Sequence, residues 1–244
     1  MNTRGTDIDR YERQWRLAGI GPEKQAEIRR ARVLIVGAGG LGSPVALYLA
    51  AAGTGTIGLA DDDVVALSNL QRQIIHDTRS LDVPKVESAK RKMTALNPEV
   101  TVVKHEVRVD AANAPALFTA YDIVVDCTDN IAAKYMLADA CTRIGKPLVY
   151  GTIVGYEGYV TTFVPGGVTL RDIFGDRPEP GQIPSPAVVG TFGPAVGVIG
   201  SLQAAEVLKW ITGAGELLNG RLLYVDTQTM EFNVLTVGRT PGEN

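Results

Sequence analysis

The sequence predicts an α/β fold with a mostly parallel, twisted sheet that is flanked by helices and continued by antiparallel strands on its C-terminal side. Residues 33–53 have the pattern of a buried strand, a glycine-rich turn and a helix. Apolar runs and helical patterns then alternate as far as Tyr150, which is typical of parallel strands joined by crossover helices. Residues 156–164 and 222–237 instead show the period-two alternation of antiparallel strands.

The glycine-rich turn is the most informative stretch of the chain. Residues 33–36 are apolar, Gly37, Gly39 and Gly42 follow with G-x-G-x-x-G spacing, and an alanine- and leucine-rich helix runs to Gly53. In such a unit the three glycines allow a tight turn, the close approach of a phosphate, and close packing of the helix on the strand. The helix N-terminus adds free N–H groups and a positive dipole. We therefore expect a Rossmann-like sheet that binds a nucleotide.

The remaining elements are predicted from periodicity and from Gly and Pro positions. Besides residues 33–36, the predicted parallel strands are residues 56–60, 100–105, 121–126 and 147–150. Besides the helix after the glycines, the predicted helices are residues 9–20, a helix opened by Pro22, and residues 83–96, 111–119 and 131–144. Residues 165–190 contain five prolines and several glycines, and we expect a long, mobile connection of functional importance.

Composition excludes several classes of protein. The 244 residues carry a formal net charge of −3, which argues against a nucleic-acid or acidic-membrane surface. Residues 1–10 lack the apolar segment of a secretory signal, and two cysteines cannot form a disulfide framework, so we expect a cytoplasmic enzyme. Residues 187–205 carry no charge but contain a proline, several glycines and polar side chains, which predicts a buried or interface helix and not a membrane span.

Acidic residues follow two of the predicted strands. Asp61 comes about 20 residues after the glycines, where a carboxylate commonly binds the ribose hydroxyls of a nucleotide. Asp129 follows the fourth strand, at the edge where open parallel sheets bind ligands, and is a candidate ligand for the Mg²⁺ that accompanies a triphosphate. The alternative for Asp129 is a cap of the helix that begins at residue 131, for which Asn130 is the better candidate.

Amide and cationic groups gather in an insert after the second strand. Asn69, Arg72 and Gln73 lie close together in sequence, and Lys85 opens the next helix. Lys85 faces the positive end of that helix dipole, which is unfavourable by roughly 0.3–1 kcal/mol at an exposed site unless an anion binds nearby. Scattered surface charge is the alternative for each residue alone. Together with the two acidic groups, the cluster favours a site for a triphosphate and Mg²⁺.

Four side chains are candidates for reactive groups. Cys127 stands at a strand end, but no histidine is near it in sequence, so a core position is favoured over a nucleophile. Cys141 and His105 are expected to be structural. His76 is a candidate for assisting chemistry, although a hydrogen-bonded structural role is favoured. Because the sequence has no C-x-x-C pair, cysteine chelation of a metal is excluded.

Three late glycines recur at small-residue spacing along one predicted helix. Gly193, Gly197 and Gly200 permit another element to approach that helix closely. The partner is either another part of the chain or the second copy in a symmetric dimer, and the sequence leaves both open.

A set of short motifs is distributed along most of the chain, from Arg10-Tyr-Glu-Arg-Gln14 to about Trp210. The motifs are Gly37-Ala-Gly-Gly-Leu-Gly42, Asp61 with Asp63, Leu67-Ser-Asn-Leu-Gln-Arg-Gln73, Pro84-Lys85, Asp126-Cys-Thr-Asp-Asn130 and Gly197-Val-Ile-Gly-Ser-Leu-Gln-Ala204. Together they resemble the ThiF/MoeB/HesA family of ubiquitin-activating-like adenylyltransferases. The glycine motif alone is a weak marker. The seven consecutive residues 67–73, with Cys-Thr-Asp-Asn at the right place, make the resemblance specific.

The resemblance implies a single adenylation domain over residues 1–244. It would activate the C-terminal carboxylate of a small ubiquitin-like sulfur-carrier protein ending in Gly-Gly, which attacks the α-phosphorus of ATP and releases pyrophosphate. The domain would comprise a helical arm at residues 1–30, a nucleotide-binding half at 31–151, and a carrier-binding and dimer half at 152–244. In the expected homodimer, Arg13 would reach the γ-phosphate of the other subunit.

The resemblance also assigns roles to site residues. Asp61 would bind the ribose and Asp129 the Mg²⁺, while Asn69, Arg72 and Lys85 would hold the phosphates. The residues expected to act in catalysis are Arg13, Arg72, Lys85 and Asp129. The full set expected to bind ATP is Gly37, Gly39, Gly40, Gly42, Asp61, Asp63, Asn69, Arg72, Gln73, Lys85, Asp129 and Asn130.

Departures from the family pattern lead to two further expectations. Many members carry zinc on two C-x-x-C pairs, but the matching stretches here, Val168-Thr-Leu-Arg-Asp-Ile-Phe174 and Arg239-Thr-Pro-Gly-Glu-Asn244, contain no cysteine. No structural zinc is therefore expected. Some members place a reactive cysteine in the crossover loop, and residues 165–190 contain none. The enzyme is expected to stop at the adenylate or to pass it to a sulfur donor elsewhere.

Three other functions are open at this point. An NAD-dependent oxidoreductase would explain the glycines and Asp61 but leaves Arg72, Lys85 and Asp129 without a role. A family member that adenylates a peptide or small-metabolite carboxylate is compatible with the missing cysteines. A non-catalytic binding module is disfavoured, because every polar residue of the motif set is present.

Overall fold

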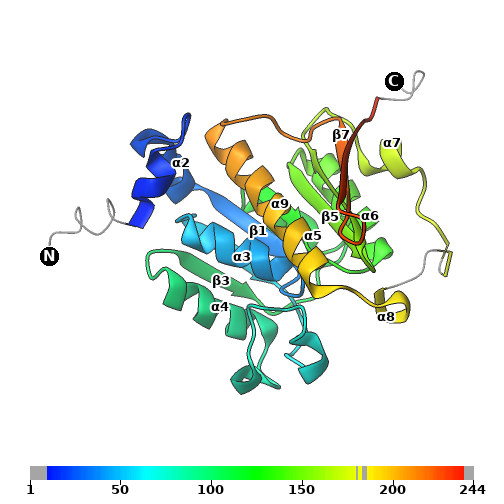
Figure 1. Ribbon diagram of the computed structural model, residues 1–244, viewed down its shortest axis with the longest axis horizontal. Coiled ribbons are helices and arrows are strands. Elements are labelled where there is room, and N and C mark those ends of the chain that lie inside the picture. The colour runs from blue at the N-terminus through cyan, green and yellow to red at the C-terminus, as the bar shows by residue number, and fades with distance from the viewer. Residues whose placement is uncertain (1–9, 180, 183–185, 239–244) are drawn as a thin grey trace, which may run out of the picture.

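In the computed structural model, which describes residues 10–179, 181–182 and 186–238, an eight-stranded sheet lies between layers of helices (Figure 1). In sheet order the strands are β3 (Thr101–His105), β2 (Thr56–Ala60), β1 (Arg32–Val36), β4 (Ile123–Asp126), β5 (Leu148–Val154), β6 (Glu157–Phe163), β7 (Arg221–Asp226) and β8 (Glu231–Thr236). The strands from β3 to β5 pair in parallel, and β6 to β8 continue the sheet in antiparallel pairs. The predicted fold class is confirmed.

The strand order reverses beside β1. From β1 the chain builds the sheet outward through β2 and β3, and then returns to add β4 on the other side of β1. Val36 and Asp126, the last paired residues of β1 and β4, lie opposite each other. The loops that follow the two strands therefore leave the same edge of the sheet, at the kind of switch point where open α/β sheets bind ligands.

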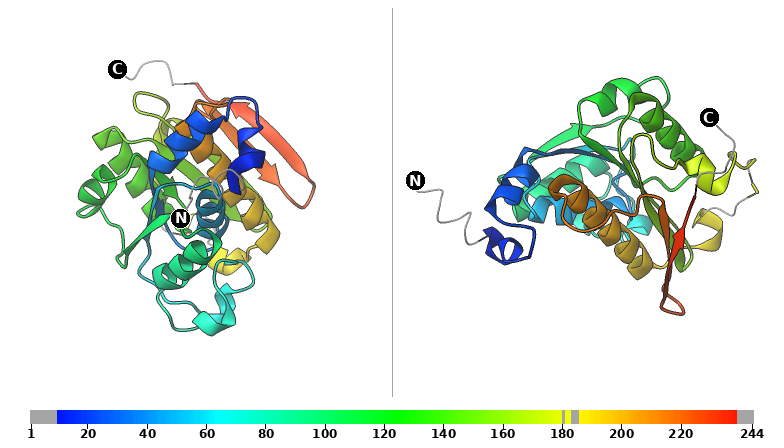
Figure 2. Two further views of the ribbon diagram at one scale, coloured as in Figure 1. Left: turned by 90° about the vertical axis from the view of Figure 1, so that its left-hand side faces the viewer. Right: turned by 90° about the horizontal axis from the view of Figure 1, so that it is seen from above.

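Helices cover both faces of the sheet, as the view from above in Figure 2 shows. The helices on one side are α2 (Pro22–Arg30), α3 (Gly42–Ala51), α4 (Lys85–Leu96) and α9 (Gly193–Thr212). Those on the other side are α5 (Ala114–Thr119), α6 (Ile131–Ile144) and α7 (Leu170–Phe174). Residues 33–36 of β1 are buried throughout, because Val33 and Ile35 enter one apolar cluster and Leu34 and Val36 the other.

Among the helices and strands predicted between residues 9 and 164, most lie within two residues of their predicted bounds, and three differ by more. β5 runs on to Val154, because beyond Tyr150 it pairs with β6 in a tight hairpin that local periodicity does not reveal. α5 begins only at Ala114, because the Asp110 carboxylate accepts hydrogen bonds from backbone N–H groups in a turn before it. The N-terminal helix, predicted over 9–20, is helical at residues 10–15.

The connection at residues 165–190, predicted to be a long mobile segment, contains regular structure. It includes α7 and a short helix α8 (Pro186–Val189). A capping box starts α7: the Thr169 N–H donates to the Asp172 carboxylate, and the Asp172 N–H donates to the Thr169 hydroxyl. Residues 180 and 183–185 of this connection lie outside the described part of the chain, as do residues 1–9 and 239–244.

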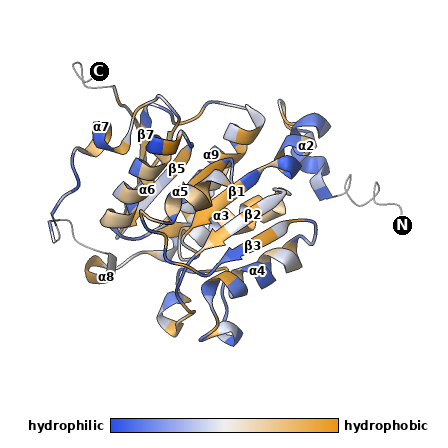
Figure 3. Cartoon of the chain, turned by 180° about the vertical axis from the view of Figure 1, so that it is seen from behind, coloured by the Kyte–Doolittle hydropathy of each residue, from blue (hydrophilic) through white to orange (hydrophobic). Residues whose placement is uncertain are grey.

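The uncharged run at 187–205 forms most of α9, which packs against α3 and the sheet. Ala195, Val196 and Ile199 are buried in the core, which confirms the prediction of a buried helix. Among the described helices, none is long and apolar enough to cross a membrane. Figure 3 shows the matching distribution of hydropathy, with apolar strands in the middle and polar residues on the outside of α2 and α4.

Gly200 lies where α9 crosses α3. A Cβ atom at Gly200 would collide with the Pro44 side chain and the Leu41 carbonyl, so packing within the chain accounts for this glycine. A Cβ at Gly193 would stand 2.7 Å from the Gln71 carbonyl oxygen, whereas one at Gly197 would meet nothing within 4 Å. Among the described residues, packing within the chain therefore accounts for Gly193 and Gly200 but not for Gly197.

Gly200→Ala is expected to lower the free energy of unfolding by about 1–3 kcal/mol, because the added methyl group overpacks the α3–α9 crossing. Gly197→Ala, in the same helix but facing open space, is the matched control. It is expected to leave stability unchanged or to raise it by up to about 1 kcal/mol through helix propensity. Urea unfolding measures both variants, and equal stabilities would contradict the packing described here.

Candidate active site

The turn after β1 touches the turn after β4. Gly37 has φ of +99°, and a Cβ atom there would lie 2.6 Å from the Cys127 carbonyl oxygen. A Cβ atom on Gly42 would collide with the Gly37 carbonyl oxygen. Only glycine fits at either position, so the spacing seen in the sequence reflects two backbone segments packed without room for side chains.

The glycine turn leaves backbone donors free at the start of α3. No side chain caps α3, and within the described residues the N–H groups of Gly39, Gly40 and Leu41 donate to no acceptor. A helix N-terminus with free N–H groups binds anions such as phosphate through both hydrogen bonds and the helix dipole. This donor set fits a nucleotide phosphate.

Asp61 ties the glycine turn to the end of β2. One carboxylate oxygen accepts from the Ala38 N–H at 2.8 Å, and the other accepts from the Asp63 N–H at 2.9 Å. Burial raises the pKa of Asp61, while the Lys85 ammonium and the two N–H groups act in the opposite direction. Asp61 therefore lies beside the glycine turn, at the edge where a ribose is expected.

Lys85 is placed by carboxylates. Its ammonium lies 2.7 Å from an Asp63 oxygen and 4.0 Å from an Asp61 oxygen, and its side chain is only 7% exposed. From the sequence, a bound anion is expected to offset the unfavourable dipole at the start of α4, but these two carboxylates of the chain already do so. Sequence spacing could not reveal the pair with Asp63, since the two residues are brought together by the turn into α4.

The 67–73 insert packs onto the glycine turn. Its 3₁₀ turn η1 (Leu67–Asn69) is closed by the Asn69 side-chain oxygen, which accepts from the Ala66 N–H at 3.1 Å. A Cβ atom on Gly40 would be 3.7 Å from the Arg72 side chain, and one on Gly39 would be 3.3 Å from the Gln73 amide nitrogen. The insert thus brings Arg72 and Gln73 beside the free N–H groups, as the sequence predicts.

Gln73 carries an unsatisfied polar atom at this place. Its side chain is 5% exposed, and its carbonyl oxygen Oε1 has no hydrogen-bond partner within the described residues. A buried acceptor without a partner is costly and marks a place where a ligand or water completes the site. Arg72, in contrast, is half-buried and donates from Nη1 to the Ser68 carbonyl at 3.2 Å.

His76 has a structural role. Its Nε2 lies 2.8 Å from the Ala38 carbonyl oxygen and its Nδ1 lies 2.9 Å from the Ser88 hydroxyl, so it links the glycine turn to α4. Burial lowers the pKa of His76, and the nearby Lys85 charge acts in the same direction. His105 is also structural, with Nε2 2.6 Å from the Tyr121 hydroxyl.

The 127–130 turn leaves one carboxylate free. Asn130 accepts from the Ala133 N–H at 2.8 Å and caps α6, which confirms it as the better cap. Because this cap uses its side-chain oxygen, only its amide group is left for the nucleotide. Asp129 is exposed, and its side chain has no hydrogen-bond or ion-pair partner within the described residues.

The two cysteines are core residues. Cys127 is buried, and burial is the main cause that raises the pKa of its thiol well above the ordinary value. Burial likewise raises the pKa of Cys141 to about 12. A thiol held in its protonated form is a poor nucleophile, so the favoured core assignment is confirmed.

Arg13 is the one predicted site residue that lies away from the others. Its helical arm packs at the far end of α3, where the Tyr11 ring covers Gly53 and Gln14 bonds to Gln25. α3 starts at the glycine turn and has ten residues, so the two ends are about 15 Å apart. The Arg13 side chain is exposed and lies outside the site of its own chain.

Two polar side chains behind the site, Lys134 and Gln203, are not among the predicted site residues. Lys134 of α6 contacts Asp126, and the Gln203 amide of α9 donates to the Asp126 carbonyl at 2.8 Å. The available signal was a lone polar residue in an apolar helical stretch. Such a residue indicates a buried partner, since an unpaired charge or amide would not be buried.

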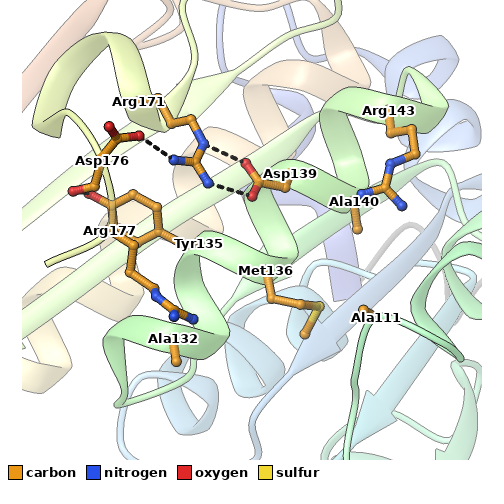
Figure 4. A pocket seen from close by; sticks show the side chains of 10 residues that line it. All are labelled: Ala111, Ala132, Tyr135, Met136, Asp139, Ala140, Arg143, Arg171, Asp176 and Arg177. Atoms are coloured by element: carbon orange, nitrogen blue, oxygen red, sulfur yellow. Dashed lines mark hydrogen bonds and ion pairs between the residues drawn. The ribbon is translucent and has the colours of Figure 1, made fainter. Parts of the chain in front are cut away.

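A cavity of about 440 Å³ lies along the outer side of α6 and contains none of the predicted site residues (Figure 4). Met136 and Arg143 of α6 line it on one side. On the other side Arg171 forms two hydrogen bonds with Asp139, at 2.9 and 3.1 Å, and one with Asp176 at 2.9 Å. These ion pairs fasten α7 and the chain after it to α6.

Comparison with known proteins identifies the family. The model described as "ThiF family" matches residues 11–244. The chain belongs to the ThiF family. The resemblance inferred from the motifs is thereby confirmed. The sulfur carrier protein adenylyltransferase of Thermus thermophilus is 44% identical over 96% of this chain and 89% of its own length. The SAMP-activating enzyme E1 of Haloferax volcanii is 43% identical over 97% of this chain and 87% of its own length.

A longer relative and two solved structures are also similar to this chain. The probable adenylyltransferase/sulfurtransferase MoeZ of Mycobacterium tuberculosis is 42% identical over 96% of this chain, which spans 61% of MoeZ. A crystal structure of E. coli MccB with MccA-N7isoASN has the same fold, with a TM-score of 0.84 and 24% identity over 96% of this chain and 73% of that one. A structure of E. coli MccB with ATP matches at 25% identity and a TM-score of 0.78, over 89% of this chain and 67% of that one.

The lowered pKa of His76 predicts a pH dependence of stability. As the pH falls below about 6.5, the unfolded chain takes up a proton at this position that the folded chain resists, so the free energy of unfolding falls. His76→Gln keeps a donor and an acceptor but cannot titrate, and it should lose this part of the decline. Urea unfolding at about pH 7.5 and about pH 5.5 measures it. Parallel pH profiles for the wild type and His76→Gln would contradict the assignment.

Proposed function

We propose that this ThiF-family chain is an ATP-dependent adenylyltransferase. It activates the C-terminal Gly-Gly carboxylate of a small ubiquitin-like sulfur-carrier protein, forms an acyl-adenylate and releases pyrophosphate. The observation that carries the proposal is the convergence of Arg72 and the Asp61–Lys85 pair on a glycine turn with free N–H groups. The names of the Thermus and Haloferax relatives, a sulfur carrier protein adenylyltransferase and a SAMP-activating enzyme, support the reaction type and the carrier partner.

Electrostatics explains why the reaction needs these groups. The attacking carboxylate and ATP are both anionic, and negative charge grows on the phosphates as pyrophosphate leaves. Catalysis is then mainly positioning and charge stabilisation, as in other phosphate chemistry. Arg72 and Lys85 would supply positive charge at fixed positions, and no side-chain nucleophile is required for adenylation.

Binding of ATP would use groups around the glycine turn that, within the described residues, can still take a hydrogen bond. The free N–H groups after Gly37 would hold phosphate oxygens, Asp61 would accept from the ribose hydroxyls, and Gln73 would gain a partner for Oε1. Asn69 has its amide nitrogen left for a phosphate oxygen, because only Oδ1 closes the 3₁₀ turn. The positions of these groups support the predicted roles of the glycine turn, Asp61, Asn69 and Gln73 in binding ATP.

Asp129 would hold the Mg²⁺ that accompanies ATP. Its carboxylate is exposed at the carboxyl edge of β4 and has no partner within the described residues, which is the donor type Mg²⁺ prefers. The metal would offset phosphate charge. Asp63 is less available, because it is paired with Lys85 at 2.7 Å.

A homodimer would complete the site through Arg13. The placement of Arg13 at the far end of α3 argues against a role in its own chain, and supports the prediction that it acts on the partner's nucleotide. The carrier would then bind the half of the chain formed by residues 152–244, where the antiparallel strands extend the sheet.

We also propose that the enzyme acts in the cytoplasm. A separate proposal is that it needs no structural zinc. The stretch that carries cysteines in many relatives forms α7, which is fastened by its capping box and by the ion pairs of Arg171 with Asp139 and Asp176. Metal analysis of the purified protein tests this directly, and stoichiometric zinc would contradict it. Because both cysteines are buried, sulfur transfer would use a donor elsewhere.

A peptide or small-metabolite carboxylate is the second candidate substrate. The match to a structure of MccB with ATP shows that a relative of this fold binds ATP without settling the acceptor here. An NAD-dependent oxidoreductase is disfavoured, because it leaves Arg72, Lys85 and Asp129 without a role.

Pyrophosphate–ATP exchange tests the proposal. Wild-type protein is expected to exchange label only when a carrier ending in Gly-Gly is present. Arg72→Ala and Asp129→Ala should reduce exchange by at least about 100-fold, because each removes charge stabilisation at the phosphates. Arg79→Ala is the matched control, since Arg79 is exposed and pairs only with Asp77 among the described residues. Exchange driven by a peptide or small acid, but by no carrier, would move the assignment to the second candidate.

Mixing two inactive variants tests the role of Arg13 across the dimer. Arg13→Ala and Asp129→Ala should each be inactive as homodimers, but their mixed dimer contains one complete site. Equal amounts should therefore recover about one quarter of wild-type exchange after subunits re-assort, because half of the dimers are mixed. No recovery, with mixed dimers demonstrated by differently tagged chains, would place Arg13 outside the partner's site.

A further inference from the structure

Lys134 is a buried cation close to the candidate Mg²⁺ ligand. It lies in the first turn of α6, four residues after the Asn130 cap, and is 2% exposed. Its ammonium stands 3.3 Å from both carboxylate oxygens of Asp126, 2.6 Å from the Gly151 carbonyl oxygen, and 5.1 Å from the centre of the Tyr150 ring. Lys134 thus joins α6, the end of β4 and β5.

The same Asp126 carboxylate holds the turn that carries Asp129. The Thr128 N–H donates to Asp126 Oδ1 at 2.9 Å, and the Thr128 hydroxyl donates to the same oxygen at 2.7 Å. Asp126 is fully buried, so its charge is compensated by Lys134 and by these hydrogen bonds. Asp129 follows Thr128 directly and has no bond of its own within the described residues. Its position is therefore set by the backbone of this turn.

The buried Lys134–Asp126 ion pair is not expected to add much to the stability of the fold. A cation in the first turn of a helix opposes the helix dipole, and a buried ion pair loses hydration that an apolar pair would not. Such a pair has a use when it fixes one geometry. We infer that Lys134 is a positioning residue, which orients Asp126 so that the 127–130 turn presents Asp129 to the nucleotide–metal complex. This inference rests on the proposed adenylation.

The test measures turn order and activity separately. Lys134→Met, Lys134→Arg and Thr128→Val are compared by hydrogen–deuterium exchange of the peptide containing residues 127–130, without nucleotide. Lys134→Met and Thr128→Val should exchange faster there than the wild type. For Lys134→Met, the kcat of carrier-dependent pyrophosphate exchange should fall by about 10–100-fold, because a displacement of Asp129 by about 1 Å is enough for such a loss. For Thr128→Val the fall in kcat should be smaller. Lys134→Arg should recover part of both.

Thr128→Val keeps the test valid if Lys134→Met does not fold, because Thr128 is only half-buried. Glu206→Gln is the control for loss of a buried charge elsewhere: Glu206 accepts from the Thr162 hydroxyl and the Leu218 N–H, away from the turn. It should lower stability but leave kcat and the 127–130 exchange unchanged.

The outcomes distinguish this inference from the proposed function. Wild-type exchange rates at 127–130 and wild-type kcat in folded Thr128→Val and Lys134→Met would overturn the positioning role. A wild-type chain that shows no carrier-dependent exchange would overturn the proposed function. In that case faster deuterium uptake in the variants would still show that Lys134 orders the turn.

Discussion

The contact between two backbone turns organises this molecule. Gly37 rests on the Cys127 carbonyl without room for a Cβ atom, so the loops after β1 and β4 are held together at one edge of the sheet. The strand order places them there, and the glycines allow them to meet. Asp61, Arg72 and His76 lie around the glycine turn of this pair. A side chain at Gly37 would strain the turn, and it would also separate the free N–H groups of the glycine turn from Asp129.

Two lysine–aspartate ion pairs lie near that contact, and both have the same arrangement. Lys85 and Lys134 both stand at the start of a helix, where the dipole disfavours a cation, and each is compensated by aspartate at the end of the preceding strand. Lys85 lies beside Asp61 next to the glycine turn, whereas Lys134 is buried behind the turn that carries Asp129. In the proposed reaction, Lys85 would contact the phosphates directly, whereas Lys134 would act only by positioning the turn that carries Asp129.

Most helices and strands could be predicted from the sequence, because periodicity and motif spacing are local signals. The same spacing predicts the gathering of Asp61, Arg72 and Lys85 near the glycine turn, while their roles stay predictions. The strand at residues 56–60 and the helix at 131–144 were predicted to the residue. The partners of Lys85 and Lys134 were not, because ion pairs between a strand end and a helix start depend on three-dimensional register. The extension of β5 was missed for the same reason, since its partner β6 defines it.

The central claim is that the site delivers the α-phosphorus of ATP to a carboxylate. Incubation of the chain with a Gly-Gly carrier and ATP labelled at either the α- or the γ-phosphorus tests this most directly. The account predicts that α-label appears on the carrier, that γ-label does not, and that a carrier without its last glycine receives neither. Label transferred from the γ-phosphorus would contradict it.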